Sequence, residues 1–329
     1  MLIHNYENVI GMPNLLLAWE EFLIGKKSRK DVQEFQFNLM DNMLSLHEDL
    51  ASGTYKHGGY QEFKINDPKP RTIHKASVRD RLLHHAVYRV LYYYFNQRFI
   101  FDSYSCRISR GPHEAILRFS QFARRVSKNH TRTCWILKCD IRKFFHSIDQ
   151  HLLLRILEKH IEDKKILHLL GEIIGSFDGG SPAKAGLPLG NLTSQLFCNI
   201  YMNEFDQFVK HTLRIKHYVR YADDFVILSE DKPYLQQLLT KINEFLTEKL
   251  KLQLHPEKVF IQTFSSGVDC LGWVHFNEHK VLRTKTKQRM FKKLQYNNSL
   301  PVLSSYLGLL KHGNAVKIKH QLLNNYEAK

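Results

Sequence analysis

The sequence predicts an α+β protein in which a small, largely antiparallel sheet is backed by helices. Apolar residues make up 43% and charged residues 24% of the 329 positions, a balance typical of a folded globular chain. Long segments place apolar residues at helical spacing, and short apolar runs between turn residues indicate strands. No run reaches the roughly 18 apolar residues that a membrane-spanning helix needs. The length suits one large or two ordinary domains.

The expected helices share apolar residues that recur every three to four positions along one face. Polar residues around 25–30 interrupt the first helical segment, and Pro112 suits the first turn of a later helix. We expect helices at about 14–52, 78–99, 112–128, 150–174, 191–213 and 233–250, followed by a basic helical tail.

The expected strands are short apolar runs. Residues 134–140 (CWILKCD) form one, and HYVRYA and FVILS flank Asp223-Asp224 as a β-hairpin with the aspartates at its turn. Further strands are expected at 258–264, 270–276 and 280–284. The stretch 53–70 contains Gly58-Gly59 and the prolines of PKP, Pro68 and Pro70, which favour turns over regular structure.

The net charge is the first indication of function. Lys and Arg total 48 against 32 Asp and Glu, which gives +16 and a pI of about 9.5. A chain this basic usually binds a polyanion, most often nucleic acid and less often an anionic membrane. The alternative is an ordinary solvated basic surface. The five cysteines form no C-x-x-C pair, and the N-terminus lacks the features of a secretory signal. Both observations favour a cytoplasmic protein with reduced thiols and no zinc site.

The chemistry is indicated by YADD, residues 221–224. Two adjacent carboxylates among apolar strands repel each other and lose solvation, so such a pair is typical of a divalent cation site. The alternative is an Asp-rich hairpin turn. Asp140 ends the strand CWILKCD and supplies a third carboxylate, or else serves as a helix N-cap. Together the three would suit a two-metal site, in which one ion activates a hydroxyl and the other holds the leaving phosphate.

Several motifs in order give the chain a resemblance to a known family. DIRKFF, LPLGNLTSQ, YADD, HPEK and CLGW resemble, in that order, motifs A to E of reverse transcriptases. Upstream, PKPRTI, VRDRLLHHAV and DSYSCRISRGPHEAI resemble the fingers segments of small bacterial reverse transcriptases, and SSYLGLLKHGN downstream resembles their thumb. The resemblance covers about residues 19–314. It implies a right-hand polymerase fold with N-terminal helices and fingers at 1–130, a palm at 131–276 with a finger or helical insertion near 150–186, and a thumb at 277–329.

The second motif narrows the resemblance. Most reverse transcriptases read Gln-Gly-x-x-x-Ser-Pro there, whereas this chain has Leu189-Gly190 and then Ser194-Gln195. That pattern resembles the reverse transcriptases of diversity-generating retroelements, which copy a template-repeat RNA with errors at adenines. Their cDNA rewrites a variable gene, a process called mutagenic retrohoming. The alternatives are a retron-type or phage-defence reverse transcriptase, and a non-catalytic RNA-binding protein on a polymerase fold.

The resemblance assigns the catalytic metals to named positions. Asp140, Asp223 and Asp224 would be the catalytic residues and would hold two Mg²⁺ ions, with Mn²⁺ as an alternative metal. The backbone carbonyl of Ile141 would be a further ligand.

It also assigns nucleotide contacts. Arg71 would grip the triphosphate, Phe145 would exclude a ribose 2′-OH, Leu189 and Gly190 would lie beneath the nascent base pair, and Lys258 would give a proton to the leaving pyrophosphate. The alternatives from the residues alone are a surface cation for Arg71, a buried aromatic for Phe145 and a solvated lysine for Lys258.

For the nucleic-acid strands, Leu271, Gly272 and Trp273 would form the primer grip, or else plain β core. Gln195 would line the template track, or else lie on a helix surface. The implied partners are template RNA, the cDNA primer strand, the RNA–DNA hybrid, dNTPs and a small, basic, pentameric accessory variability protein.

Overall fold

A computed structural model of the chain describes residues 1–66, 70–179 and 184–327, with Pro68 and Lys69 of the PKPRTI motif outside them. The chain divides into two compact units. The first comprises 1–101, 141–214 and 243–253, and the second comprises 102–140, 215–242 and 254–329. The expected α+β class is confirmed, with helices and strands in both units. The three-part division into fingers, palm and thumb stays a prediction.

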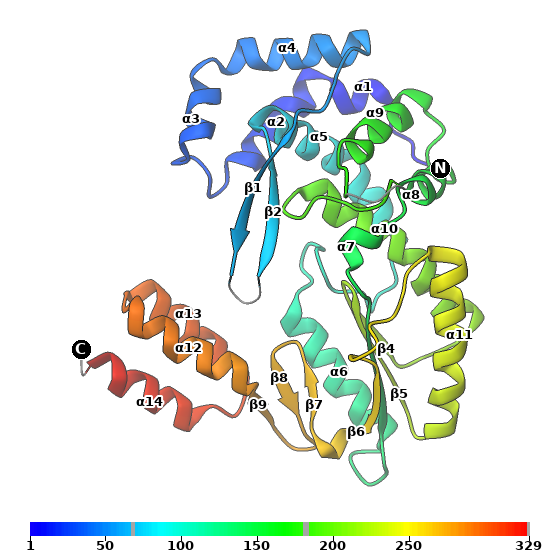
Figure 1. Cartoon of the computed structure of the whole chain (residues 1–329), viewed down its shortest axis with the longest axis vertical. Helices are drawn as coiled ribbons and strands as arrows, with labels where there is room; N and C mark the ends of the chain where they lie inside the picture. The colour runs from blue at the N-terminus through cyan, green and yellow to red at the C-terminus, as the bar shows by residue number, and fades with distance from the viewer. Residues whose placement is uncertain (67–69, 180–183, 328–329) are drawn as a thin grey trace. The chain divides into compact units, whose positions relative to one another are not determined.

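The first unit is a set of helices around α5 (Val78–Asn96), together with one hairpin (Figure 1). Ser77 caps α5 by accepting from the Asp80 backbone N–H, and α5 packs mainly against α2 and α10. The other helices of this unit are α1 (Tyr6–Ile10), α2 (Met12–Leu23), α3 (Lys30–Phe37), α4 (Leu39–Ser52), α7 (Phe144–Ser147), α8 (Gln150–Glu158), α9 (Lys164–Gly175), α10 (Leu192–Gln207) and the π-helical turn Phe208–Thr212.

Two expectations for this unit were wrong. The turn-rich stretch contains a strand, β1 (Tyr60–Ile65), which pairs antiparallel with β2 (Arg71–Ala76). The helix expected at 150–174 is two helices, because Asp163 accepts from the backbone N–H groups of Lys165 and Ile166 and thereby starts α9 anew.

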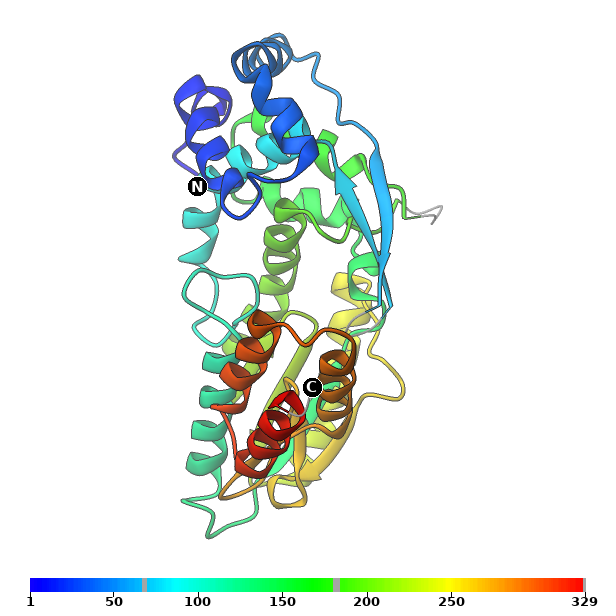
Figure 2. The same ribbon diagram turned by 90° about the vertical axis from the view of Figure 1, so that its left-hand side faces the viewer.

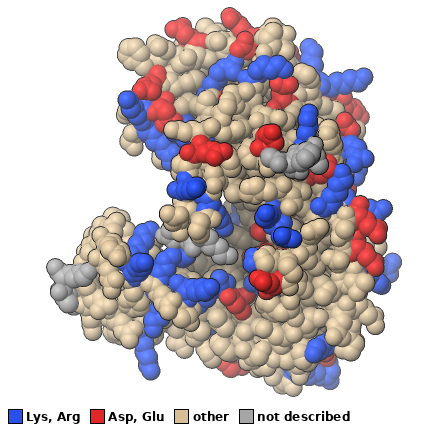
Figure 3. All heavy atoms as spheres, in the orientation of Figure 1, with Lys and Arg blue, Asp and Glu red and all other residues tan. Residues whose placement is uncertain are grey.

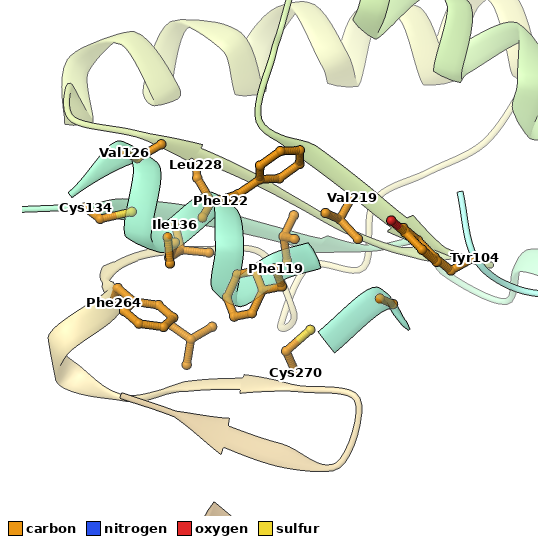
Figure 4. Close-up of a cluster of buried hydrophobic side chains, with 14 residues drawn as sticks. Tyr104, Phe119, Phe122, Val126, Cys134, Ile136, Val219, Leu228, Phe264 and Cys270 are labelled. Carbon is orange, nitrogen blue, oxygen red and sulfur yellow. The ribbon is translucent and has the colours of Figure 1, made fainter. Parts of the chain in front are cut away.

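The second unit is built on a four-stranded antiparallel sheet, in the order β4 (Tyr218–Tyr221), β5 (Asp224–Ser229), β3 (Trp135–Asp140), β6 (Phe260–Thr263). Helix α6 (Pro112–Val126) covers one face, where Phe119 and Phe122 pack on alternate strand residues (Figure 4). The apolar stripe of α6 was visible in the sequence, and it forms this core by facing the sheet. Helix α11 (Lys232–Leu250) starts in this unit and ends in the first.

The rest of the second unit is a small sheet and three helices. Strands β7 (Val268–Cys270), β8 (Trp273–His275) and β9 (Lys280–Leu282) form an antiparallel sheet. The strand expected at 270–276 is therefore interrupted by a turn at Leu271-Gly272, where both residues have positive φ. Helices α12 (Thr284–Tyr296), α13 (Leu300–Leu310) and α14 (Val316–Glu327) lie side by side in Figures 1 and 2, around a core that includes Trp273.

Two absences bear on the sequence expectations. All five cysteines are free thiols, and four of them are buried. Within the described ranges, no helix is both long enough and apolar enough to span a bilayer.

Candidate active site

Two strands of the second unit bring carboxylates together. Asp140 is the last residue of β3 and Asp224 is the first residue of β5, and the antiparallel register pairs them directly. Directly opposed residues place their Cβ atoms about 4.5–5.5 Å apart on the same face of a sheet. The two runs, CWILKCD and DFVILS, form strands because their apolar residues are buried on both faces of the sheet. The register therefore places two like charges side by side at the end of the sheet.

A two-residue turn adds the third carboxylate. Tyr221 pairs with Asp224, so Ala222 and Asp223 form the hairpin turn between β4 and β5. Ala222 has φ 55°, the left-handed conformation that such turns require. The guanidinium of Arg220, which is 1% exposed, donates to the Ala222 carbonyl oxygen at 3.1 Å. Arg220 thus helps to hold the turn from within the core.

Burial and neighbouring carboxylates raise the pKa of two aspartates in this cluster. Burial, followed by the charge of Asp224, raises the pKa of Asp223 from 3.8 to about 6. Burial also raises the pKa of Asp224, and the hydrogen-bonded carboxyl of Asp140 adds to the effect, while Lys138 opposes it. Clustered carboxylates that resist ionisation gain most from a nearby cation.

A lysine supplies one positive charge to this cluster. Lys258 Nζ donates to Asp140 Oδ1 at 2.9 Å. The HPEK segment positions it, because the His255 backbone N–H donates to the Asp140 carbonyl at 2.8 Å and the Lys258 N–H donates to the His255 carbonyl at 3.0 Å. The turn thus ties Lys258 to the same residue through backbone and side chain.

The residues fit a divalent cation in chemistry and charge. Asp140, Asp223 and Asp224 offer hard oxygen donors, which Mg²⁺ and Mn²⁺ prefer, and burial together with neighbouring carboxylates raises the pKa of Asp223 and of Asp224. In the described part of the chain, however, no three Asp, Glu, His or Cys side chains form a ready ligand set. These three carboxylates would hold such a cation, and Lys258 contacts one of the two Asp140 oxygens, Oδ1.

Two further cations belong to this site and were not singled out from the sequence. Lys138, on β3, lowers the pKa of Asp224 and donates to the Asp269 carbonyl oxygen at 2.8 Å. Arg220 holds the turn as described. Both occupy strand positions where an apolar residue would be expected. A basic residue within an otherwise apolar strand is the sequence feature that could have identified them.

The turn between β7 and β8 lies close to the carboxylate hairpin. Leu271 and Tyr221 both pack at the edge of the core shown in Figure 4, and both line a small recess with Asp224. Gly272 follows with φ 86°. Trp273, the next residue, is 1% exposed and packs among the helices α12 to α14. Its buried indole therefore anchors the turn to that core.

The first unit brings a second group of the sequence-predicted residues together. The His74 N–H on β2 donates to the Leu189 carbonyl at 2.9 Å, and Asn191 Nδ2 donates to the His74 carbonyl at 2.9 Å. Between them, Gly190 has φ 107°, and a Cβ there would lie 2.7 Å from Ile73 Cγ2. Glycine is required here for both its conformation and its size. His74 and Asn191 were not predicted as site residues, because nothing in the sequence distinguished them from the residues beside them.

The remaining predicted residues of the first unit occupy separate places. Arg71 is exposed at the start of β2, opposite Ile65. Phe145 is half-buried in α7, and its carbonyl accepts from the Leu187 N–H at 2.8 Å, which links it to the Leu189 segment. Ile141 is 1% exposed, and Gln195 is half-buried on α10.

The sequence pattern of the family described as reverse transcriptase (RNA-dependent DNA polymerase) matches residues 63–275. The chain belongs to the reverse transcriptase family. This reverse transcriptase is 25% identical over 290 residues to protein YkfC of Escherichia coli, with 77% of the chain and 74% of YkfC covered. It is 23% identical to the group II intron-encoded protein LtrA of Lactococcus lactis, with 78% of the chain but only 53% of LtrA covered.

Solved structures agree on the fold. Apo telomerase from Candida tropicalis, truncated from its C-terminal domain, superposes with a TM-score of 0.52 at 14% identity, covering 74% of this chain and 60% of that one. The likeness confirms the right-hand polymerase fold. The reverse transcriptase is an RNA-directed DNA polymerase, as its family match establishes, and enzymes of this family bind template RNA and depend on divalent metal ions.

Proposed function

We propose that this reverse transcriptase copies a template-repeat RNA into adenine-mutagenised cDNA that diversifies a target gene. The observation that carries the proposal is the segment Leu189-Gly190 followed by Ser194-Gln195, where most reverse transcriptases have Gln-Gly and Ser-Pro. The Leu189 backbone carbonyl is held by His74, while its side chain is half-buried and has no polar atom. The position can therefore contact a base pair by packing alone.

Loss of a polar contact has a direct consequence for fidelity. A glutamine before the glycine could hydrogen-bond polar groups of the nascent pair, and a site built to hydrogen-bond rejects wrong partners strongly. An apolar contact distinguishes shapes by only about 1–3 kcal/mol. A mispair therefore costs less beside Leu189. The preference for errors at adenine comes from the family resemblance and not from this argument.

We propose the following roles for the two groups of site residues. Asp140, Asp223 and Asp224, with the Ile141 carbonyl, would hold two divalent metal ions, either Mg²⁺ or Mn²⁺, of which one would activate the primer hydroxyl and the other would hold the leaving phosphate. Lys258 would give a proton to the leaving pyrophosphate. The 2.9 Å hydrogen bond from Lys258 Nζ to Asp140 Oδ1 supports this role, because it places the ammonium group beside one of the three carboxylates.

Nucleotide selection falls to the first unit in this proposal. Arg71 contacts the triphosphate, because an exposed guanidinium suits phosphate oxygens. Phe145 blocks a ribose 2′-OH, and Leu189 with Gly190 supports the nascent pair. Gln195 contacts the template strand.

The strands are held by the second unit in this proposal. The turn at Leu271-Gly272, braced by Trp273, contacts the primer. Lys and Arg side chains gather over α12 in Figure 3 and would contact the phosphates of the RNA–DNA hybrid, with affinity that falls as salt rises. The basic residues of α12 are Lys285, Lys287, Arg289, Lys292 and Lys293. We also propose a small, basic, pentameric accessory protein as a partner, on the family resemblance alone.

A comparison of Leu189→Gln with Leu189→Met tests the fidelity argument. Both enzymes and the wild type copy one template RNA with all four dNTPs, and the cDNA is sequenced. We expect the glutamine variant to misincorporate several-fold less often opposite template adenine while retaining most of its yield. The methionine variant, which stays apolar and similar in volume, should match the wild type. Equal adenine error frequencies in all three enzymes, at normal yield, would remove Leu189 from the mechanism.

A second candidate is an intron-type reverse transcriptase. It is favoured by the similarity to LtrA and to the putative COX1/OXI3 intron 2 protein of Saccharomyces cerevisiae, which is 22% identical. The chain spans only 53% and 36% of these two proteins. A template repeat with a matching variable repeat beside the gene would decide for the first candidate, and an intron surrounding the gene would decide for the second.

A further inference from the structure

Lys138 joins the four-stranded sheet to the turn between β7 and β8. Its Nζ atom donates a hydrogen bond to the backbone carbonyl of Asp269 at 2.8 Å. Asp269 lies on β7, two residues before Leu271, which is the first residue of that turn. The bond links segments that are 131 positions apart in the chain, so it fixes a contact that the local sequence does not set.

Lys138 reaches the turn from the face of the sheet that carries the carboxylates. Lys138 lies opposite Val226, and Asp140 lies opposite Asp224. Residues two apart on a strand point to the same face, so Lys138, Asp140 and Asp224 share one face. Asp224 is a diagonal neighbour of Lys138, within reach of a long side chain. Lys138, Asp224 and Leu271 also line one small recess, so the lysine lies beside both a carboxylate and the turn.

Arg283 holds the same turn from its other side. Its guanidinium donates to the Asp269 carboxylate, and its backbone N–H donates to the Gly272 carbonyl at 3.1 Å. Arg283 immediately precedes α12. The two side chains of the ion pair are 34% and 40% exposed, and at such exposure an ion pair adds little to the free energy of unfolding. A charge-assisted hydrogen bond does restrict geometry, so the pair serves to hold the turn in place.

The turn depends on these anchors because its own sheet is small. Strands β7 and β8 have three residues each, so few ladder hydrogen bonds fix the hairpin. Leu271 has φ 50°, a left-handed conformation that costs free energy in a residue other than glycine and persists only where surrounding contacts hold it. Lys138 and Arg283 supply such contacts. They tie residues 269–272 to the four-stranded sheet on one side and to the start of α12 on the other.

We propose that Lys138 is a positioning residue that, together with Arg283, sets the distance between the Leu271-Gly272 turn and Asp224. The inference deepens the proposed function and rests on it, since there the turn contacts the primer and Asp224 holds a metal ion. A primer end displaced by about 1 Å from the reacting atoms can react about 100-fold more slowly. The proposed contacts that select the nucleotide lie in the first unit, so Lys138 affects the rate of extension and not the affinity for dNTP.

Primer extension by the full chain in Mg²⁺ tests the role of Lys138, with kcat and the KM for dNTP measured separately. Lys138→Met keeps the length of the side chain and removes the donor, and we expect kcat to fall about 10–100-fold while the KM changes less than about twofold. Lys138→Arg, which restores a donor, should recover most of the loss.

Lys232→Met is the matched control, because Lys232 contacts Trp135 at the other end of β3. We expect it to extend primers as the wild type does. A Lys138→Met enzyme with the kcat of this control would overturn the inference. A KM for dNTP that rises as much as kcat falls would mark a general loss of structure and would also count against a positioning role.

Arg283→Met gives an independent arm, which serves if Lys138→Met does not fold. It breaks the ion pair with Asp269 and leaves the backbone bond to Gly272, so we expect a smaller fall in kcat than in Lys138→Met. Because both residues hold one turn, the double variant should lose little more than the slower single variant. Losses that multiply would show that the two residues act separately and would refute the shared anchor. Arg132→Met, which breaks the ion pair with Glu230 elsewhere in the second unit, is the control and should keep the wild-type kcat.

Two further measurements separate failure of this inference from failure of the proposed function. A primer that ends in 4-thiothymidine should photo-crosslink within 269–273 of the wild-type enzyme, and less in Lys138→Met. Wild-type crosslinks confined to other segments, or full extension by Asp223→Asn, would overturn the proposed primer contact or metal site and this inference with it. An inactive Asp223→Asn enzyme and a wild-type crosslink at the turn, with Lys138→Met as fast as Lys232→Met, would overturn the positioning role alone.

Discussion

Asp223→Asn should stabilise the metal-free enzyme while it abolishes DNA synthesis. The folded protein raises the pKa of Asp223 from 3.8 to about 6, so it binds the proton more tightly than the unfolded chain does. The charged carboxylate is therefore unfavourable in the folded state. The corresponding loss of stability is absent below about pH 4, develops as the pH rises toward 6, and is complete above that.

The magnitude follows from the shift. About two pKa units at 1.36 kcal/mol each correspond to about 3 kcal/mol, which the neutral amide would recover at pH 7.5. The sheet itself is unchanged, because Asp223 lies in the turn between β4 and β5. The catalytic consequence is opposite in sign, since an amide oxygen carries no charge to hold a metal ion.

The assay is urea unfolding of both proteins in EDTA at pH 5 and pH 7.5. We expect the variant to exceed the wild type by about 2–3 kcal/mol at pH 7.5 and by less at pH 5. Asp41→Asn, an exposed position in the first turn of α4, is the control and should change little. Millimolar Mg²⁺ should narrow the gap by stabilising the wild type alone. A variant that is less stable than the wild type in EDTA at pH 7.5 would refute the electrostatic reasoning.

Two other substitutions test the first unit. Phe145→Ala should admit ribonucleotides and so reduce the dNTP over rNTP preference in primer extension; an unchanged preference would leave Phe145 as a packing residue of α7. Gly190→Ala should lower the unfolding free energy by about 1–3 kcal/mol, because φ 107° and the nearby Ile73 methyl group both oppose a Cβ. Gly308→Ala, in the helix α13 with open space around it, should be neutral or stabilising by comparison, and similar losses in both would contradict the argument.

The carboxylate hairpin could be predicted because its determinants are local. CWILKCD and the runs around YADD are apolar segments bounded by turns, so the strands followed from the pattern and the register brought Asp140 beside Asp224. The role of Lys258 was inferred from the resemblance, but its hydrogen bond to Asp140 depends on the turn that begins at His255, which no periodicity reveals.

Other features escaped prediction for identifiable reasons. Strand β1 reads YQEFKI and is exposed over most of its length, so it lacks the apolar alternation by which strands are recognised. CLGWVHF was read as one strand, although Gly272 marked the turn that divides it. The contacts of His74 with Leu189 and Asn191 join residues more than a hundred positions apart, and pairing at that separation leaves no local signal.

The central claim is that this reverse transcriptase copies RNA with errors concentrated at adenine. The most direct measurement is deep sequencing of cDNA made by the wild-type enzyme from one RNA in which the four bases are equally frequent. The error frequency should be many-fold higher opposite template adenine than opposite guanine, cytosine or uracil. A low and even error spectrum over the four template bases would contradict the claim and would leave an ordinary reverse transcriptase.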